Sequence, residues 1–179
     1  MPQRDNLFTW LLRLWRHVWQ SERAAWRAVP DDMAARLTAR VRASEQRHSG
    51  QIRVCVEAAL PLNYAWSAGR HAPLHTVVRQ RAMAWFGRLQ VWDTEHNNGV
   101  LIYLLLAERR IEILADRGLM RHTTEAHWQN VVNGLQQRLQ AGDIETGLTQ
   151  ALEEVSALLV AHCASTAHHN ELPDLIVRA

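Results

Sequence analysis

The chain has 179 residues, close to the size of a single domain, and its 47% hydrophobic and 21% charged residues are ordinary for a globular protein. Its formal net charge of +2 is too small to indicate nucleic-acid binding. Its two cysteines, Cys55 and Cys163, exclude a disulfide framework and a cysteine-rich metal site.

The N-terminal segment lacks the pattern of a secretory signal, because Arg13, Arg16 and His17 interrupt what would be its apolar region. The longest apolar run, residues 100–107, is far shorter than the roughly 20 residues that cross a bilayer. We therefore expect a cytoplasmic protein.

Residues 6–28 have a helical pattern with two contrasting faces. Apolar side chains share one broad face: Phe8, Leu11, Leu12, Trp15, Val18, Trp19 and Trp26. Arginines recur at helical spacing on the other face. The pattern predicts an amphipathic helix with three alternative contacts for its apolar face. It could pack on the domain, pair with a second copy of the chain, or lie peripherally on a membrane with its arginines near anionic lipid.

The rest of the chain alternates between helical and strand patterns. Apolar periodicity predicts helices at 31–48, 74–89, 123–139 and 144–163, and strands at 51–58, 99–106 and 110–115. The proline-containing segment 60–73 is expected to be a loop, and the end of the chain a loosely held tail. The expected organisation is a helical extension (1–30), one α/β domain (31–163) and a C-terminal tail (164–179).

The order of these elements predicts the topology. A long helical crossover makes strands 51–58 and 99–106 parallel, and a tight turn makes 110–115 antiparallel to the second of them. Strand 99–106 is apolar on both faces, so helices are expected on both sides of it, and Gly99 at its start should have little room for a side chain. The predicted fold class is α/β. It is a small three-layer sandwich whose mixed sheet combines one parallel β-α-β unit with a β-hairpin.

Three successive stretches resemble the TPM domain family: NNGVLIYLL (97–105), RIEILADRGL (110–119) and AGDIETGLTQALEEVSALL (141–159). The resemblance covers about residues 35–162, and the segment Asn98–Leu101 is its most specific part. It implies a mixed sheet between helices. It also implies one of three roles found in the family, namely phosphatase activity, divalent-metal binding, or action as a membrane-associated accessory protein.

The sequence departs from the family pattern where acids are usual. Asn97 stands where many members have an aspartate before the Asn-Gly pair, and the turn after the third strand is Asp116-Arg117-Gly118 instead of Gly-aromatic-Gly. The acidic segment before the first helix and the C-terminal transmembrane helix of the family are not recognisable. These departures weaken the expectation of metal or phosphatase chemistry.

The predicted topology brings several polar segments to one end of the sheet, where the first two strands start and the third ends. Candidate metal ligands gather there, with two supporting side chains behind them: Asp93, Glu95, His96 and Asp116, then Glu45 and His48. Carboxylates favour Ca²⁺ or Mg²⁺, whereas paired histidines would shift the preference toward Zn²⁺. The sequence therefore predicts a divalent-cation site at this end.

A structural interpretation of the same side chains stays open. Loops at sheet ends are polar because their backbone must meet water, and Asp116 could pair with Arg117 or Arg121. Ligands of open α/β sheets usually bind at the carboxyl ends of the parallel strands, which is the opposite end. On the first strand, Arg53 and Glu57 are expected to form a local ion pair.

Two functions of different classes fit these observations. The first is a non-catalytic TPM-like binding or accessory module that acts on a partner protein or membrane surface, with an ion as an optional stabiliser. The alternative is a divalent-metal-dependent hydrolase of phosphatase type, which would need fixed ligands and an open coordination position. The sequence alone leaves open whether the protein is an enzyme.

Overall fold

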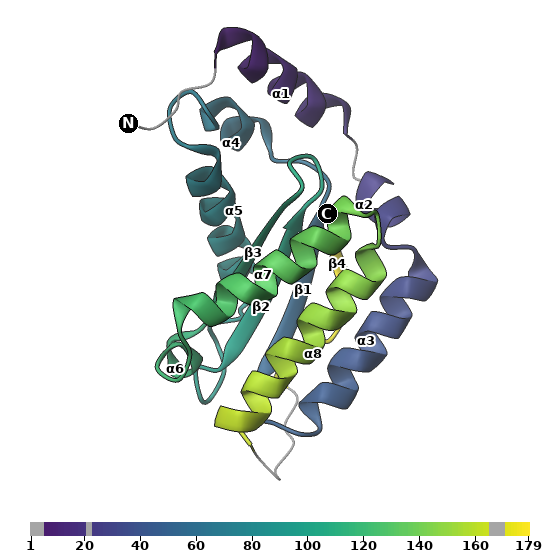
Figure 1. Cartoon of the computed structure of the whole chain (residues 1–179), viewed down its shortest axis with the longest axis vertical. Helices are drawn as coiled ribbons and strands as arrows, with labels where there is room; N and C mark the ends of the chain where they lie inside the picture. The colour runs from purple at the N-terminus through teal and green to yellow at the C-terminus, as the bar shows by residue number, and fades with distance from the viewer. Residues whose placement is uncertain (1–5, 21–22, 165–170) are drawn as a thin grey trace.

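The computed structural model describes residues 6–20, 23–164 and 171–179 of the chain (Figure 1). Its centre is a four-stranded sheet with the order β3-β2-β1-β4. The strands are β1 (Gln51–Glu57), β2 (Gly99–Leu105), β3 (Arg110–Ala115) and β4 (Val177–Arg178). Strand β1 is parallel to β2 and to β4, whereas β3 runs antiparallel to β2. The predicted parallel unit and the predicted hairpin are both confirmed.

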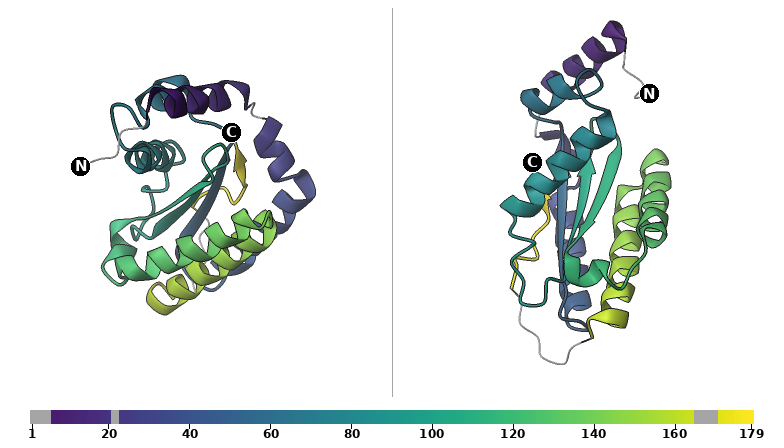
Figure 2. Two further views of the ribbon diagram at one scale, coloured as in Figure 1. Left: turned by 45° about the horizontal axis from the view of Figure 1, so that its top comes forward. Right: turned by 90° about the vertical axis from the view of Figure 1, so that its left-hand side faces the viewer.

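Helices cover both faces of this sheet and give three layers (Figure 2). One face carries α3 (Asp31–Glu45), α7 (Glu125–Gln140) and α8 (Ile144–His162), and the other carries α5 (Leu74–Arg88). Four shorter helices lie around the ends of the sandwich: α1 (Leu7–Trp19), α2 (Arg23–Ala28), α4 (Leu62–Ser67) and α6 (Arg117–Met120). The three-layer α/β fold expected from the sequence is confirmed.

Alternation along the strands divides the core in two. Ile52 and Val54 of β1 pack toward α3, α7 and α8, while Cys55 between them lies in the cluster formed with α5. Every residue of β1 and β2 is buried, as strands covered on both faces require. Gly99 opens β2 directly against Val91, where an added Cβ would overlap the Val91 carbonyl oxygen. The expectation that this glycine has little room is therefore confirmed.

The N-terminal pattern forms two helices where the sequence predicts one. α1 and α2 replace the continuous helix expected over 6–28, and residues 21–22 between them lie outside the described residues. Ala25 of α2 and Val29 after it are fully buried in the core that includes α3. The second half of the N-terminal segment is thus part of the domain packing.

Two short helices were not expected from the sequence. The segment 60–73, predicted as a loop, contains α4, which follows directly after Pro61. Proline at a helix start loses no hydrogen bond and has a suitable fixed φ, so the same residue that signals a loop here begins a helix. After β3, Asp116 caps the single turn of α6. Both helices are too short to give an apolar period.

The C-terminal segment differs from the loose tail that the sequence predicts. Residues 171–179 run along β1 and end in β4, while 165–170 lie outside the described residues. Leu172, Asp174 and Ile176 are buried in alternation. This period of two is the signature of an extended segment against a sheet, but only three such positions occur, too few to outweigh the polar composition before them.

Candidate functional site

The loop before β2 carries three of the predicted ligands. Asp93, Glu95 and His96 are all exposed. The backbone N–H of Glu95 donates to Glu171 Oε2 at 2.9 Å, so this loop is joined to the C-terminal segment. The carboxylate that makes this bond was not among the predicted residues, because nothing in the sequence places the C-terminal segment here.

Asp116 lies at the same end of the sheet and caps α6. Its Oδ1 accepts a hydrogen bond from the backbone N–H of Arg117 at 2.7 Å. Its Oδ2 is buried and has no hydrogen-bond partner among the described residues. The side chain of Arg117 donates to Asn97 instead, at 3.2 Å. Asp116 therefore acts as a capping residue that keeps one carboxylate oxygen unused.

Glu45 and His48 support the junction between α3 and β1. The buried His48 ring bonds Ser44 Oγ at 2.8 Å and the Gly50 carbonyl oxygen at 3.0 Å. Burial lowers the pKa of His48 to about 4, so the ring is neutral at pH 7. Glu45 Oε1 accepts from the Ile52 N–H at 2.9 Å. Burial, and then the neighbouring Asp174, raise the pKa of Glu45 to about 8.

A cavity of about 500 Å³ opens at this end of the sheet, and it collects histidines instead of carboxylates. His96 lines it together with His122 and His162, whose rings stack with centroids 5.3 Å apart. Across the described residues, no three His, Cys, Asp or Glu side chains converge as a metal-ligand group. The structure thus brings His96 next to unpredicted histidines and leaves Asp93 and Glu95 at the surface. Cation binding by the predicted set stays a prediction.

The opposite end of the sheet holds a buried charged network. Glu57, at the end of β1, accepts from Arg81 of α5, with Nε 3.0 Å from both carboxylate oxygens. The hydroxyl of Tyr103 on β2 donates to Glu57 Oε2 at 2.6 Å. The predicted local pair between Arg53 and Glu57 is therefore wrong. Arg81 reaches Glu57 from α5 across the layer, a contact that strand alternation alone cannot reveal.

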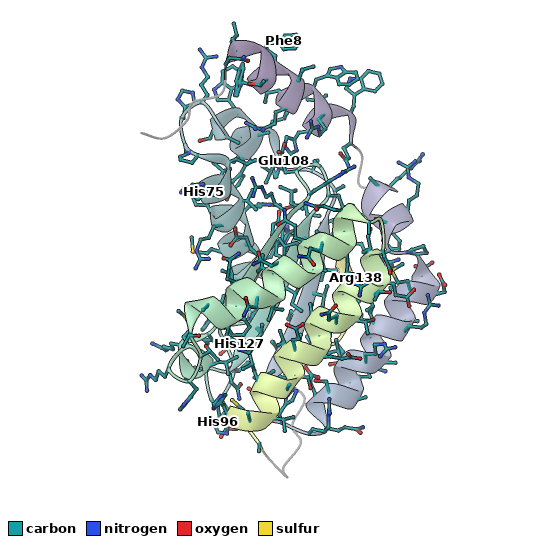
Figure 3. All side chains as sticks on the ribbon, in the orientation of Figure 1. Phe8, His75, His96, Glu108, His127 and Arg138 are labelled. Carbon is teal, nitrogen blue, oxygen red and sulfur yellow. The ribbon has the colours of Figure 1, made fainter. Side chains whose placement is uncertain are left out.

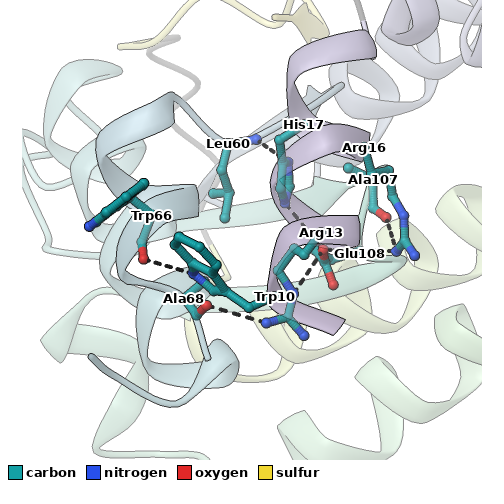
Figure 4. A network of polar contacts seen from close by, with 9 residues as sticks. All are labelled: Trp10, Arg13, Arg16, His17, Leu60, Trp66, Ala68, Ala107 and Glu108. Atoms are coloured by element: carbon teal, nitrogen blue, oxygen red, sulfur yellow. Dashed lines mark hydrogen bonds and ion pairs between the residues drawn. The ribbon is translucent and has the colours of Figure 1, made fainter. Parts of the chain in front are cut away.

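The polar side of α1 binds this end of the domain (Figure 4). Trp10 is buried, and its indole N–H donates to the Trp66 carbonyl oxygen at 3.1 Å. Arg16 Nη1 donates to the Ala107 carbonyl oxygen at 3.1 Å. α1 is thus held through directed bonds to α4 and to the turn between β2 and β3.

Glu108, in that turn, receives two guanidinium groups and the imidazole of α1. Its carboxylate lies 3.3 Å from Arg13 Nε, 3.1 Å from His17 Nε2 and 3.9 Å from Arg16 Nη1. Burial by itself raises the pKa of Glu108, but the hydrogen bond from His17 and the two guanidinium charges outweigh it, and the net pKa is lowered. A buried carboxylate in this turn is therefore kept ionised by α1.

Because its polar side faces the domain, α1 presents its apolar side to solvent. Seven large apolar side chains of this helix are between 47% and 71% exposed: Leu7, Phe8, Leu11, Leu12, Trp15, Val18 and Trp19. We call this set the α1 apolar face. Figure 3 labels Phe8 on it, at the end of the molecule opposite His96. For the α1 members of the predicted apolar face, packing on the domain is therefore wrong, whereas Trp26 of α2 stacks on Arg178 at 3.6 Å.

Cations accompany the α1 apolar face. Arg16, Arg23 and Arg27 are exposed on α1 and α2, and the described residues of these two helices include no acid. On the side of α1 that faces the domain, the exposed Arg70 stacks on the Trp10 ring at 4.8 Å. Among the helices of the described chain, none has the length and apolar character needed to cross a bilayer.

Comparison with known proteins identifies the domain. A family model for the TPM domain matches residues 28–158. The chain belongs to the TPM domain family. The family match begins at the end of α2, so α1 and its apolar face precede the TPM domain.

Solved structures show the same fold. The BA42 protein from the psychrophilic bacterium Bizionia argentinensis superposes with a TM-score of 0.71 at 24% identity, covering 84% of this chain and 95% of BA42. The N-terminal domain of a P. gingivalis protein gives a TM-score of 0.54 at 20% identity, covering 78% of this chain and 82% of that domain. At such identities the likeness concerns the fold alone. No curated protein matches the chain.

Proposed function

We propose that this TPM-domain protein is a non-catalytic accessory module that attaches to anionic membrane surfaces through the α1 apolar face. The observation that carries the proposal is the inverted orientation of α1. Trp10, Arg13 and His17 face the domain, while the apolar side of the same helix faces water. Exposed apolar patches of this extent on a soluble domain generally mark an interaction surface.

The chemistry around the α1 apolar face favours lipid as its partner. Tryptophan is enriched at the boundary between lipid headgroups and acyl chains, and Trp15 and Trp19 are 61% and 71% exposed. The neighbouring Arg23 and Arg27 would contact anionic headgroups, each contributing about 1 kcal/mol near such a surface. The described residues of α1 and α2 include no acid, so in a two-fold dimer through this face these helices of one copy would offer no carboxylate to the arginines of the other.

Co-sedimentation with vesicles tests the proposal. The full chain is mixed at low salt with vesicles of phosphatidylglycerol and phosphatidylcholine, and with vesicles of phosphatidylcholine alone. We expect binding to the anionic vesicles and at least about tenfold weaker binding for the double variant Trp15→Ser/Trp19→Ser, since each buried aromatic side chain contributes roughly 1.5–3 kcal/mol. Trp92→Ser is the matched control, because Trp92 is 53% exposed in a loop far from α1.

Other outcomes would contradict membrane attachment. If the wild-type protein stays in the supernatant with anionic vesicles, the proposal fails. If size-exclusion chromatography with light scattering finds a dimer that the double variant loses, the α1 apolar face serves a second copy of the chain. A pull-down that needs the same two tryptophans but no lipid would assign the face to a protein partner.

A second candidate is the metal-dependent phosphatase that the family resemblance raised. The observation in its favour is the buried and unpartnered Oδ2 of Asp116, which offers an oxygen to a cation. Hydrolysis of p-nitrophenyl phosphate in the presence and absence of Mg²⁺ tests this candidate. Metal-dependent turnover that Asp116→Asn abolishes would replace the non-catalytic proposal.

A further inference from the structure

A second cavity, of about 680 Å³, lies at the carboxyl end of β1, away from the predicted cation site. It is bounded by the end of β1, by α5, by β4 and by the last turn of α1. Open α/β sheets usually bind their ligands outside the carboxyl ends of parallel strands. The volume also falls within the range of about 300–1,000 Å³ that is usual for small-molecule sites.

One wall of the cavity is an aromatic ring between two guanidinium groups. Trp85 of α5 lies 5.2 Å from the Arg81 guanidinium carbon and 4.9 Å from that of Arg88, measured to the ring centroid. Trp85 is only 6% exposed, and its indole N–H has no acceptor among the described residues. A buried N–H without a partner costs free energy, so an acceptor supplied by a ligand would be favoured.

Of the three arginines that line the cavity, two have carboxylate partners and one has none among the described residues. Glu57 neutralises Arg81 through Nε and Nη2, and Asp31 pairs with Arg178 at 2.7 Å. Arg88 is exposed at the cavity, and within the described chain no carboxylate lies within ion-pair distance of it. Arg88 therefore places a guanidinium without an ion-pair partner among the described residues beside the cavity, and its planar fork suits carboxylate and phosphate groups.

Apolar side chains also line the cavity. Leu60, Leu89 and Val177 border the same space. We propose that the cavity binds a small organic anion, whose carboxylate or phosphate is held by Arg88 and whose apolar body lies against Trp85 and these side chains. Carboxylate and phosphate share the required oxyanion chemistry, and separate probes distinguish them.

The proposed site also touches α1. His17 and Gln20 line the cavity, and His17 is one of the residues that bind Glu108. A ligand in the cavity would contact the domain-facing side of α1 and so stabilise the position of this helix. This site is independent of membrane attachment, because the α1 apolar face is on the opposite side of the helix from His17.

A titration followed by NMR tests the site. Benzoate and phenyl phosphate are added separately to the ¹⁵N-labelled full chain, and the Trp85 indole N–H signal is followed, after assignment with Trp85→Phe and backbone experiments. We expect at least one probe to shift this signal in a saturable manner, with half-saturation at or below about 10 mM. Arg88→Gln should weaken binding about tenfold or more, since it removes a charge-assisted hydrogen bond.

Controls separate this site from general surface binding. Arg79→Gln removes an arginine from the same helix, outside the cavity, and should bind the probes as the wild type does. Benzyl alcohol has the same ring without the charge and should not saturate the signal. The proposal is overturned if neither anion gives a saturable shift, if Arg88→Gln binds like the wild type, or if benzyl alcohol binds equally well. The response to benzoate compared with phenyl phosphate then identifies the oxyanion that the site prefers.

Discussion

His17 of α1 and Glu108 of the turn between β2 and β3 meet at 3.1 Å, with their side chains 0% and 6% exposed. The backbone N–H of Leu60 donates to the other ring nitrogen of His17, Nδ1, at 3.0 Å. Nδ1 must therefore be unprotonated, and Nε2 carries the proton that is donated to Glu108. The pair ties a helix that precedes the TPM domain to a hairpin inside it.

Removing the charge of Glu108 should release α1. In Glu108→Gln, Arg13 and Arg16 lose the carboxylate that they share, and the docking of α1 should weaken by roughly 2–3 kcal/mol. Hydrogen exchange should then become faster at the amides of α1, and trypsin should cleave after these arginines sooner. Glu153→Gln is the control, because Glu153 forms an exposed pair with Arg40 at 3.6 Å and should change little. Unaltered exchange in α1 would contradict the assigned role of Glu108.

Glu45 should make the protein less stable as the pH rises. Burial beside Asp174 raises its pKa from 4.5 to about 8, so the folded protein holds this proton more tightly than the unfolded chain. The resulting stability is fully present below pH 4.5 and is lost between about pH 4.5 and 8. Glu45→Gln imitates the protonated form at every pH. Its unfolding free energy, relative to the wild type, should increase by roughly 3–4 kcal/mol between pH 5 and pH 8. A difference that does not change with pH in urea denaturation would show that Glu45 ionises normally.

The sequence predicted the layers and the strand directions because these depend on local periods. Ile52, Val54 and Val56 occupy alternate positions of β1 and point into the same core. The long crossover between β1 and Gly99, where β2 starts, predicts a parallel pairing of the two strands. The candidate site was harder to predict from the sequence, since its contacts depend on side chains far apart along the chain. Glu171 joins the loop before β2 only because the C-terminal segment runs beside β1, and no local pattern gives that path.

The orientation of α1 could not be predicted from the sequence either. A helix with one apolar face usually buries that face, and this rule predicts the wrong side here. The side of α1 that faces the domain is held by directed contacts instead, among them those of Arg13 and His17 with Glu108. A pairing between residues so far apart leaves no periodic signal in a single sequence.

The close packing at Gly99 should make it intolerant of side chains. In Gly99→Val the added atoms would meet the Val91 backbone, which cannot yield as a flexible side chain would. We expect a loss of more than about 1 kcal/mol of unfolding free energy, and a lower melting temperature. Gly87→Ala on α5 is the matched control, since nothing lies within 4 Å of its added Cβ, and it should be neutral or slightly stabilising. A melting temperature of Gly99→Val equal to that of the wild type would contradict the packing argument.

The predicted cation site makes its own prediction, centred on Asp116. Its Oδ2 has no partner among the described residues, while Asp93 and Glu95 are exposed on the loop at the same end of the sheet. Few fixed ligands allow only weak binding, so calorimetry with millimolar Ca²⁺ or Mg²⁺ should give a small saturable heat for the wild type. Asp116→Asn keeps the oxygen that accepts from the Arg117 N–H but removes the charge, and should abolish this heat. Glu153→Gln removes a distant exposed carboxylate and should leave the heat unchanged.

Two outcomes would contradict this cation site. If the wild type gives no heat at saturating cation, Asp116 serves as a helix cap alone. If the wild type and Asp116→Asn give equal heats, the ion binds elsewhere.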